Sequence, residues 1–366
     1  MQSGNYTKQI KILSDCLQRA IPFVAYRLPG SGKICLLVAE KVDSFFFQGQ
    51  DLFSHRGFVL VPFDNENAPA YFLKTRFDAE LDSISIEQIQ WIEQQPKIPL
   101  NLGVYHDMSC LQNYQQSFNK LFQAIQQGKI EKAILSRCHF VEHVEALKAA
   151  SFFLDLCVLQ SSTYNYLSYV PGCGLWMGAS PELFLCRNEC FFETVSLAGT
   201  MKQSNQMDWS KKDLKEQNIV TNYISEQLRD FNVDVVDKIG PKTVSVGQVA
   251  HLKTVFHFSK DSLPKNVGKF VEAFHPTPAV CGYPKKLAKQ LILQTETHQR
   301  SLYGGFLGKI DADGQFSFYV NIRCVQFFEN GVGLYVGGGI TAMSNVEEEY
   351  NETLLKADGL MLVLSK

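Results

Sequence analysis

The sequence has little net charge, no long apolar run and no C-x-x-C pair of cysteines. Its 366 residues carry 35 basic and 37 acidic side chains, for a net charge of −2, which gives no electrostatic attraction to nucleic acid or an anionic membrane. No segment reaches the roughly 18 consecutive apolar residues of a membrane-spanning helix. Residues 1–5 also lack the basic stretch that opens a signal peptide. We therefore expect a cytoplasmic protein with no nucleic-acid or membrane partner.

The ten cysteines form no C-x-x-C pair, and most stand within apolar runs, as Cys35 does between Ile34 and Leu36. We interpret them as buried free thiols in a reducing compartment. A zinc site built on Cys186 and Cys190 is the alternative, although three intervening residues are weak evidence for such a site.

The composition is that of a folded, globular chain, with 45% hydrophobic and 20% charged residues, so extended disorder is excluded. A chain of this length buries roughly three-quarters of its surface on folding, which allows a large core. Many short strands with helices between them, and few β-α-β alternations, predict an α+β fold with large antiparallel sheets. We expect one large domain over residues 1–366. Pro96 and Pro99 mark a soft boundary between a variable part, residues 1–110, and residues 115–366.

Local patterns after this boundary predict a helix and then a strand. Apolar residues recur with the helical period over 114–125, and Gly128 is suited to end the helix. Residues 132–137 are expected to form the strand.

Residues 316–328 alternate between apolar and polar side chains, which predicts one continuous strand. The Asn-Gly pair that follows is a strong signal for a two-residue hairpin turn, and the next strand is expected over 332–340. In the register set by that turn, Arg323 lies opposite Gly338. An arginine is therefore expected beside the glycines at 337–339.

Two further helices carry acidic side chains at notable positions. In the helix expected over 214–228, Glu216 falls on the apolar stripe, where a carboxylate is costly unless it meets a metal or another cation. In the last helix, Glu349, Glu352 and Lys356 share one edge. A frayed helix start and a solvated face with ordinary ion pairs are the alternatives. The apolar stripe of the last helix is expected to consist of Val346, Tyr350, Leu354 and Ala357.

Eight short blocks between residues 115 and 360 occur in a specific order. They are Lys132–Arg137, Ser180–Phe184, Leu197–Thr200, His251–Leu252, His275–Gly282, Arg300–Gly305, Ile322–Cys324 and Gly337–Ile340, the last followed by Glu349-x-x-Glu352-x-x-x-Lys356. In this order they resemble the chorismate-utilising enzymes, which include anthranilate, aminodeoxychorismate, salicylate and isochorismate synthases. The resemblance implies the chorismate-binding fold of anthranilate synthase component I, with sheets packed as a sandwich and helices outside.

Two positions separate the chemistries within that family. The first block opens with lysine in members that add water to chorismate and typically with glutamine in members that add ammonia, and here it opens with Lys132. The residue before the Gly-Thr pair is a lysine nucleophile in the aminodeoxychorismate enzymes, and here it is Ala198. The combination resembles isochorismate synthase, an isomerase. Salicylate synthase, an ammonia-dependent anthranilate synthase and an inactive regulatory paralogue are the alternatives.

The reaction implied by this resemblance adds water at C2 of chorismate and removes the C4 hydroxyl. It needs a base for the water and an acid for the leaving group. We assign Lys132 as the base and Glu182 as the acid. Burial should then lower the pKa of the lysine and raise that of the carboxyl group.

The resemblance also implies a magnesium ion held by Glu216 and Glu352 with Glu349 nearby, a set of oxygen ligands that suits Mg²⁺. The block around Glu216 lacks the histidine that often flanks this glutamate. No feedback motif of the anthranilate synthases is found, so we expect no amidotransferase subunit. Nothing in the sequence signals an interface, and we expect a monomer. The compact chain without obvious fused domains favours menaquinone as the pathway, with catecholate siderophores as the alternative. A purely structural role for His251 stays open. The expected substrate contacts are Gly199, Thr200, His251, Ala279, Tyr303, Arg323, Gly337, Gly338, Gly339 and Lys356.

Overall fold

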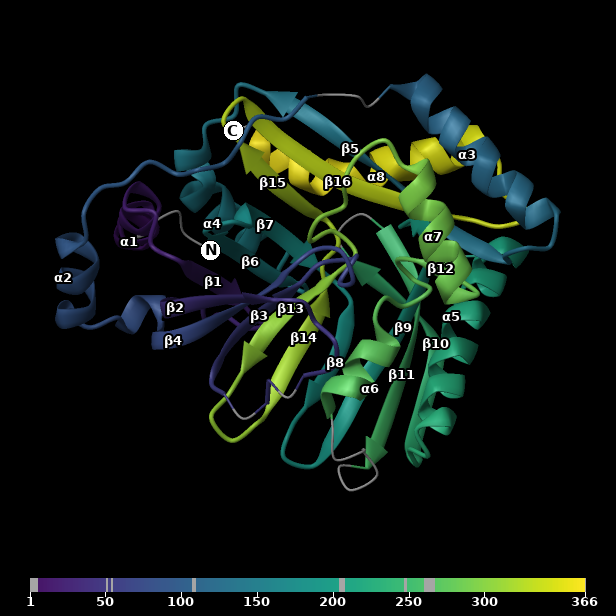
Figure 1. Cartoon of the computed structure of the whole chain (residues 1–366), viewed down its shortest axis with the longest axis horizontal. Helices are drawn as coiled ribbons and strands as arrows, with labels where there is room; N and C mark the ends of the chain where they lie inside the picture. The colour runs from purple at the N-terminus through teal and green to yellow at the C-terminus, as the bar shows by residue number, and fades with distance from the viewer. Residues whose placement is uncertain are drawn as a thin grey trace.

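The computed structural model describes residues 6–50, 52–53, 55–106, 110–203, 208–246, 249–259 and 267–365. Within these ranges the strands form one 16-stranded sheet with helices over its faces (Figure 1). The predicted α+β class with a large antiparallel sheet is confirmed. Residues 1–5, on which the expectation of no signal peptide rests, lie outside the described residues.

The elements follow one another along the chain as follows. They are α1 (Tyr6–Gln18), β1 (Phe23–Arg27), β2 (Cys35–Phe45), β3 (Gly57–Val61), β4 (Ala70–Glu80), η1 (Leu81–Ser83), α2 (Ile86–Gln94), α3 (Leu111–Gln126), β5 (Lys132–Glu142), η2 (Ala146–Lys148), α4 (Ala149–Leu159), β6 (Tyr164–Val170), β7 (Gly174–Ser180), β8 (Leu183–Arg187), β9 (Phe191–Lys202), α5 (Lys211–Asp230), β10 (Val235–Val246), β11 (Val249–Ser259), α6 (Val267–Phe274), β12 (Gly282–Tyr283), α7 (Lys285–Thr295), β13 (Phe306–Ile310), β14 (Phe316–Val320), β15 (Cys324–Phe328), β16 (Gly331–Ile340) and α8 (Val346–Leu364).

The sheet folds over, so that strands far apart in its order pack face to face. Tyr164 of β6 stacks on Tyr319 of β14 with ring centroids 4.1 Å apart, although several strands separate β6 from β14 in the sheet. Nearby, the Tyr166 hydroxyl donates a hydrogen bond of 2.7 Å to Asn321. This face-to-face packing is the expected sandwich.

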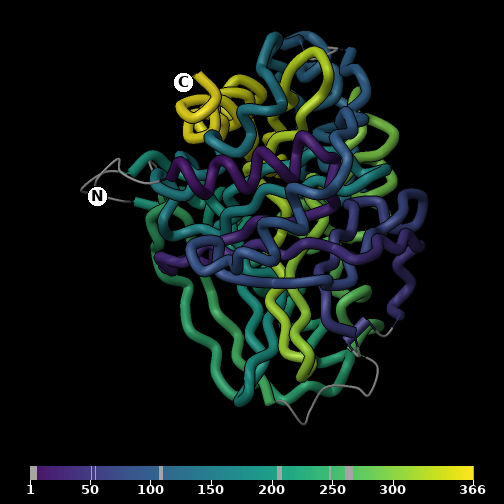
Figure 2. Tube along the Cα trace, turned by 90° about the vertical axis from the view of Figure 1, so that its left-hand side faces the viewer, coloured from purple at the N-terminus to yellow at the C-terminus, as the bar shows by residue number. Residues whose placement is uncertain are grey.

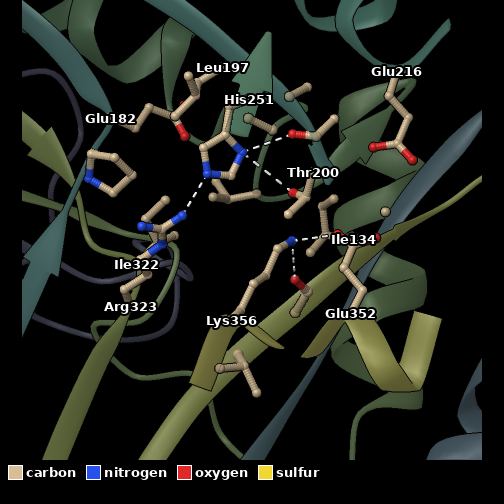
Figure 3. Close-up of a pocket in the computed structure, with 18 of the residues that line it drawn as sticks. Ile134, Glu182, Leu197, Thr200, Glu216, His251, Ile322, Arg323, Glu352 and Lys356 are labelled. Carbon is tan, nitrogen blue, oxygen red and sulfur yellow. Dashed lines mark hydrogen bonds and ion pairs between the residues drawn. The ribbon is translucent and has the colours of Figure 1, made fainter. Parts of the chain in front are cut away.

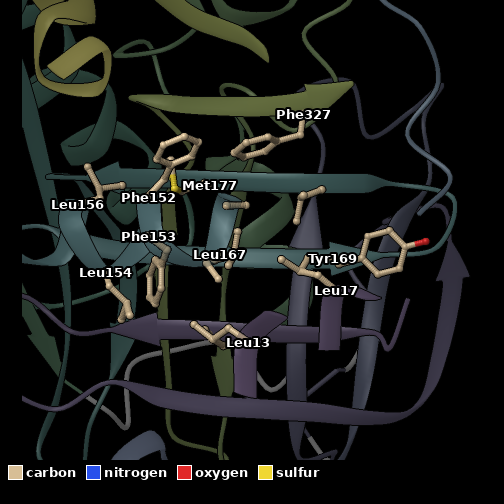
Figure 4. Packing of buried hydrophobic residues seen from close by; sticks show 14 of the residues in the cluster. Leu13, Leu17, Phe152, Phe153, Leu154, Leu156, Leu167, Tyr169, Met177 and Phe327 are labelled. Carbon is tan, nitrogen blue, oxygen red and sulfur yellow. The ribbon is translucent and has the colours of Figure 1, made fainter. Parts of the chain in front are cut away.

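Helices cover the outer faces of this sandwich and bury their own apolar stripes there. Helices α1, α4 and α8 pack on the half that contains β6, β7, β15 and β16. Figure 4 shows Leu13 of α1 and Phe153 of α4 beside Leu167 of β6 in this core. Helices α5 and α6 cover the half with β9 and β14, and α3 and α7 pack beside β5.

The strands of the N-terminal part lie in the middle of the sheet. The order β13-β3-β4-β2-β1-β6 places β1–β4 between the two halves that the rest of the chain forms. In the side view of Figure 2, the purple and blue N-terminal segments accordingly cross the middle of the molecule. Strands β1–β4 therefore join the two halves within the sheet.

The helix and strand expected after the proline-marked boundary are both present. The helix is α3, and Gly128 beyond its end has a φ of 68°, the left-handed conformation that commonly ends a helix. The strand expected over 132–137 is the first half of β5.

The single strand predicted over 316–328 is wrong. Its first part, β14, pairs with β13 and β8, whereas its second part, β15, pairs with β16 and β7. Between them Arg323 has a φ of 51°, which a strand does not accommodate. The backbone of the buried Asn321 still pairs with the segment before β13, since its N–H donates to Gly305 O and its C=O accepts from Gly304 N, both at 2.8 Å, so the interruption lies after Asn321. The alternation of apolar and polar side chains therefore continues across a point where the strand is interrupted.

The predicted hairpin register is wrong as well. Phe328 pairs with Gly331, which shifts the two strands by two residues relative to the prediction, and Arg323 does not lie opposite Gly338. The side chain of Asn330 accepts a hydrogen bond from Tyr105 N and donates one to Tyr105 O, at 3.0 and 2.8 Å. This contact with a distant segment holds the turn, and a local turn rule does not include it.

Among the described residues, no helix is both long enough and apolar enough to cross a membrane. All ten cysteines are free thiols, and five are buried. The buried ones fit the predicted interpretation, but Cys110 and Cys190 are exposed. Cys186 and Cys190 form no metal site, since no group of three or more His, Cys, Asp or Glu within the described ranges is placed to hold a metal.

Candidate active site

Most of the predicted residues line one cavity (Figure 3). Its volume, counted with its opening to solvent, is about 690 Å³. Its walls come from β5, β16 and α8 on one side and from β9, β11 and α5 on the other. Because these elements belong to opposite ends of the sheet, the cavity forms only when the sheet folds over. The predicted residues that line it are Lys132, Glu182, Gly199, Thr200, Glu216, His251, Ala279, Tyr303, Arg323, Gly337, Gly339, Glu352 and Lys356.

Two predicted residues do not line this cavity. Gly338 faces the other side of β16, where an added Cβ would lie 3.2 Å from Glu349 Oε2. Glu349 is buried behind the strand, with 1% of its surface exposed. The flanking glycines approach the site closely, because a Cβ at Gly337 would lie 2.7 Å from the Tyr303 hydroxyl and one at Gly339 would lie 2.5 Å from Glu216.

Lys132 is the first residue of β5 and is 1% exposed. Burial lowers the pKa of its ammonium group, because the neutral amine loses less hydration. Glu216 acts in the opposite direction, with its Oε2 at 3.5 Å from Lys132 Nζ, but burial dominates. The neutral form that a general base requires is therefore accessible.

Glu182 precedes β8 and lies in the same cavity, also almost fully buried. Burial raises the pKa of its carboxyl group to about 8, although Lys132 and Lys356 partly oppose the change. At neutral pH this carboxyl group is mainly protonated. The predicted shifts in opposite directions are thus both present.

His251 and Arg323 form a hydrogen-bonded pair that crosses the cavity (Figure 3). His251 Nδ1 is 2.8 Å from the carbonyl oxygen of Gly199, and Nε2 is 2.6 Å from Arg323 Nη2. Burial and the neighbouring Arg323 lower the pKa of His251 to about 3. A neutral imidazole that donates from Nδ1 and accepts at Nε2 satisfies both contacts. His251 therefore orients the guanidinium group, which makes no ion pair with any described residue.

The glutamates of α5 and α8 are joined by lysines. Lys356 Nζ lies 2.7 Å from Glu352 Oε1 and donates to the Gly337 carbonyl oxygen at 2.9 Å. Lys212, one turn before Glu216 on α5, places its Nζ 3.4 Å from Glu216, 2.6 Å from Glu349 and 3.9 Å from Glu352. Burial opposes the charged form of Lys212, but the three carboxylates outweigh it and raise its pKa.

The model of the family described as "Chorismate binding enzyme" matches residues 72–365. The chain belongs to the chorismate binding enzyme family. Isochorismate synthase EntC of Escherichia coli K12 is 29% identical over 245 residues, which are 64% of this chain and 62% of EntC. DhbC of Bacillus subtilis is 29% identical over 264 residues, 67% of this chain and 66% of that protein. The match thus spans just under two thirds of the length of these relatives.

Solved structures of chorismate binding enzymes share the fold. MenF, described as the menaquinone-specific isochorismate synthase of Escherichia coli, has a TM-score of 0.78 at 21% identity and covers 100% of this chain and 93% of its own. Anthranilate synthase component I of Streptococcus pneumoniae has a TM-score of 0.65 at 18% identity, over 92% of this chain and 89% of its own.

The magnesium ion that the sequence resemblance implies can be tested against the carboxylate cluster. Glu216, Glu349 and Glu352 offer the oxygen donors that Mg²⁺ prefers. Glu349 Oε2 is buried and accepts no hydrogen bond from the described part of the chain, so a cation there would satisfy it. As placed, however, the described residues contain no cluster tight enough to hold a metal. The donor set fits, and the three carboxylates must draw together around the ion.

The sequence patterns did not predict the buried ion pair between Glu296 and Arg300, which lies beside the cavity. Glu296 pairs with Arg300 at 2.6 Å and accepts from the backbone N–H of Ser136 at 2.7 Å. Arg300 in turn donates to the carbonyl oxygens of Ile134 and Val280 at 2.8 and 2.7 Å. This pair ties β5, which carries Lys132, to the loop at the cavity wall. The Arg300–Gly305 block was the available signal.

Lys212 was likewise missed. Its spacing of four residues before Glu216 is that of an ion pair on one helix face, which was the signal available. Beside Glu216, Gln217 Nε2 donates to Ser196 Oγ at 2.9 Å and Thr254 Oγ1 at 3.1 Å. Gln217 thus fixes α5 to β9 and β11 and does not contact the carboxylates.

Proposed function

We propose that this protein is an isochorismate synthase that isomerises chorismate by adding water at C2 and releasing the C4 hydroxyl. The observation that carries the proposal is the placement of Lys132 and Glu182 in one cavity with pKa values shifted in opposite directions. A neutral amine beside a protonated carboxyl group is the pairing that a base and an acid need in one step.

In the proposed step, Lys132 takes a proton from water as the water oxygen bonds to C2. The ring double bonds shift, the C4–O bond breaks, and Glu182 gives its proton to the leaving hydroxyl, which departs as water. The proton gained by Lys132 then returns to the Glu182 carboxylate, so the protein is unchanged after turnover. Water enters and water leaves, which makes the net reaction an isomerisation.

Chorismate carries two carboxylates, and the cavity offers positive groups for both. Arg323 is oriented by His251 and has no carboxylate partner among the described residues, so its planar fork is free for one carboxylate. Mg²⁺, when bound by Glu216, Glu349 and Glu352, would neutralise charge on the other. Lys356, beside Gly337, adds a further positive group at that end.

The direct test is to incubate the purified protein with chorismate and Mg²⁺ at neutral pH and separate the products by chromatography. Isochorismate as the main product supports the proposal. Salicylate as the main product would instead identify a salicylate synthase, and anthranilate formed with ammonium would identify an ammonia-dependent enzyme. Absence of any product would leave the inactive-paralogue alternative.

The magnesium assignment gives a second prediction. Glu352→Gln should raise the Mg²⁺ concentration for half-maximal activity by about tenfold or more, because one of three charged oxygen donors becomes neutral. Glu348→Gln, an exposed position on the same helix, is the control and should leave the Mg²⁺ dependence unchanged. An identical Mg²⁺ titration for Glu352→Gln and the wild type would remove Glu352 from the metal site.

Menaquinone synthesis stays a prediction. MenF of Escherichia coli K12 is 28% identical to this chain, and a vibriobactin-specific isochorismate synthase from Vibrio cholerae is 25% identical. Relatives named for two pathways therefore match at similar identity, and gene neighbourhood is the observation that would separate them.

A further inference from the structure

Lys212 occupies the point at which Glu216 and Glu352, which line the cavity, and Glu349, which is buried beside it, converge. Its Nζ is within 4 Å of one oxygen from each of Glu216, Glu349 and Glu352, at 3.4, 2.6 and 3.9 Å. These glutamates come from two different helices, α5 and α8. The lysine ammonium is therefore the group that now holds the two helices together at the cluster.

The three carboxylates depend on Lys212 to different degrees. Glu216 also has Lys132, and Glu352 also has Lys356. Glu349 is 1% exposed, and Lys212 is its sole ion-pair partner within the described residues. A buried carboxylate without a partner is strongly destabilising, so a cation at this point is needed for Glu349 to stay ionised.

A divalent cation held by the same carboxylates would have to take the position of this ammonium group. Mg²⁺ lies about 2.1 Å from a directly bound oxygen and about twice that from one reached through water. The Lys212 Nζ already stands within these distances of all three glutamates. Two cations this close in a buried site repel strongly, so the two states exclude one another.

We propose that Lys212 is an internal counter-ion of this cluster and that Mg²⁺ binds only by displacing it. The side chain is 19% exposed, and its flexible stem lets the ammonium group swing toward solvent. The apparent affinity for Mg²⁺ is then reduced by the fraction of molecules in which Lys212 has left the cluster. The inference rests on the proposed function only in taking these glutamates as the ligands of Mg²⁺.

The test measures metal binding without chorismate, so it does not depend on turnover. For Lys212→Met we expect Mg²⁺ to bind about tenfold more tightly than to the wild type by calorimetry. Mn²⁺, followed by the loss of its free-ion spin-resonance signal, should show the same change. Without metal, the variant should melt at a lower temperature than the wild type, and added Mg²⁺ should raise its Tm further than it raises that of the wild type.

Lys215→Met is the matched control. It removes one positive charge from the same helix at an exposed position next to Glu216, so it reports the long-range effect of charge alone. Lys212→Gln gives the same comparison if the methionine variant does not fold. Mg²⁺ affinity of the Lys212 variant equal to that of the control, weaker than wild type, or undetectable in both would overturn the proposal. If metal binding behaves as expected and no isochorismate forms, the proposed function fails and this inference stands.

Discussion

Lys132→Ala is expected to lower kcat with chorismate by about three orders of magnitude, within the range measured for loss of a general base. The amine is the group in the cavity that we assign to accept the proton from water, and alanine cannot replace it. Fold should be retained, because Glu216 keeps an ion-pair partner in Lys212 at 3.4 Å. Steady-state kinetics with chorismate and Mg²⁺, together with circular dichroism, measure both parts of the expectation.

Lys129→Ala is the control for this change. Lys129 is exposed and lies three residues before Lys132, outside the cavity, so its removal should leave kcat unchanged. A rate close to that of the wild type for Lys132→Ala would refute its assignment as the base, whatever the product of the wild-type reaction.

Glu182→Gln should lower kcat by about two orders of magnitude, since the amide has the shape of the acid but donates no proton to the leaving hydroxyl. The pH profile adds an independent readout. Because the acid must be protonated and burial raises its pKa to about 8, wild-type kcat should fall as pH rises through about 8. The residual activity of the variant should lack this alkaline decline.

Glu182→Gln should raise the thermal stability of the protein at alkaline pH, although it lowers kcat. The folded-state pKa of Glu182 is above the ordinary value of 4.5, so between these two values the unfolded chain has already lost the proton that the folded chain still binds. The contribution of the Glu182 carboxyl group to stability is thus complete at low pH and declines as pH rises toward 8. Glu182→Gln, which carries no charge, should therefore melt above the wild type at pH 8.5. Glu189→Gln, at an exposed site, should match the wild type in both measurements, and a Glu182 variant within a few-fold of wild-type kcat would contradict the assignment.

Local patterns predicted elements whose side-chain periodicity runs without interruption along the sequence. Helix α3 and strand β5 follow from helical periodicity, a glycine stop and an apolar run. Glu216 was expected on the buried stripe of its helix, and it is 6% exposed. The choice of most cavity residues came from the order of the blocks shared with the family, which spacing and composition alone do not supply.

The wrong expectations share a physical cause, which is that distant segments decide the local conformation. The alternation of residues 316–328 predicts one strand, but the left-handed backbone of Arg323 interrupts it, and the two parts pair with different strands, β13 and β16. On α8, Leu354 was expected in the core and is 41% exposed, whereas Glu349 is 1% exposed. Of the predicted stripe, Ala357 is buried and Val346 and Tyr350 pack on the core, so hydrophobicity alone misplaces only Leu354 and misses Glu349, whose burial the charge of Lys212 makes possible.

The central position of β1–β4 predicts what removal of the N-terminal part of this protein would do to the sheet. In many proteins the segment outside the conserved motifs can be trimmed away without harm to the reactive centre. Here, deletion of residues 1–110 would strip β6 and β13 of one partner each and leave two open rows of backbone amides and carbonyls, which promote aggregation. The two halves that carry the walls of the cavity would also lose the strands that join them within the sheet. The part of the chain that resembles the family least clearly therefore contains the strands that join the two halves of the sheet.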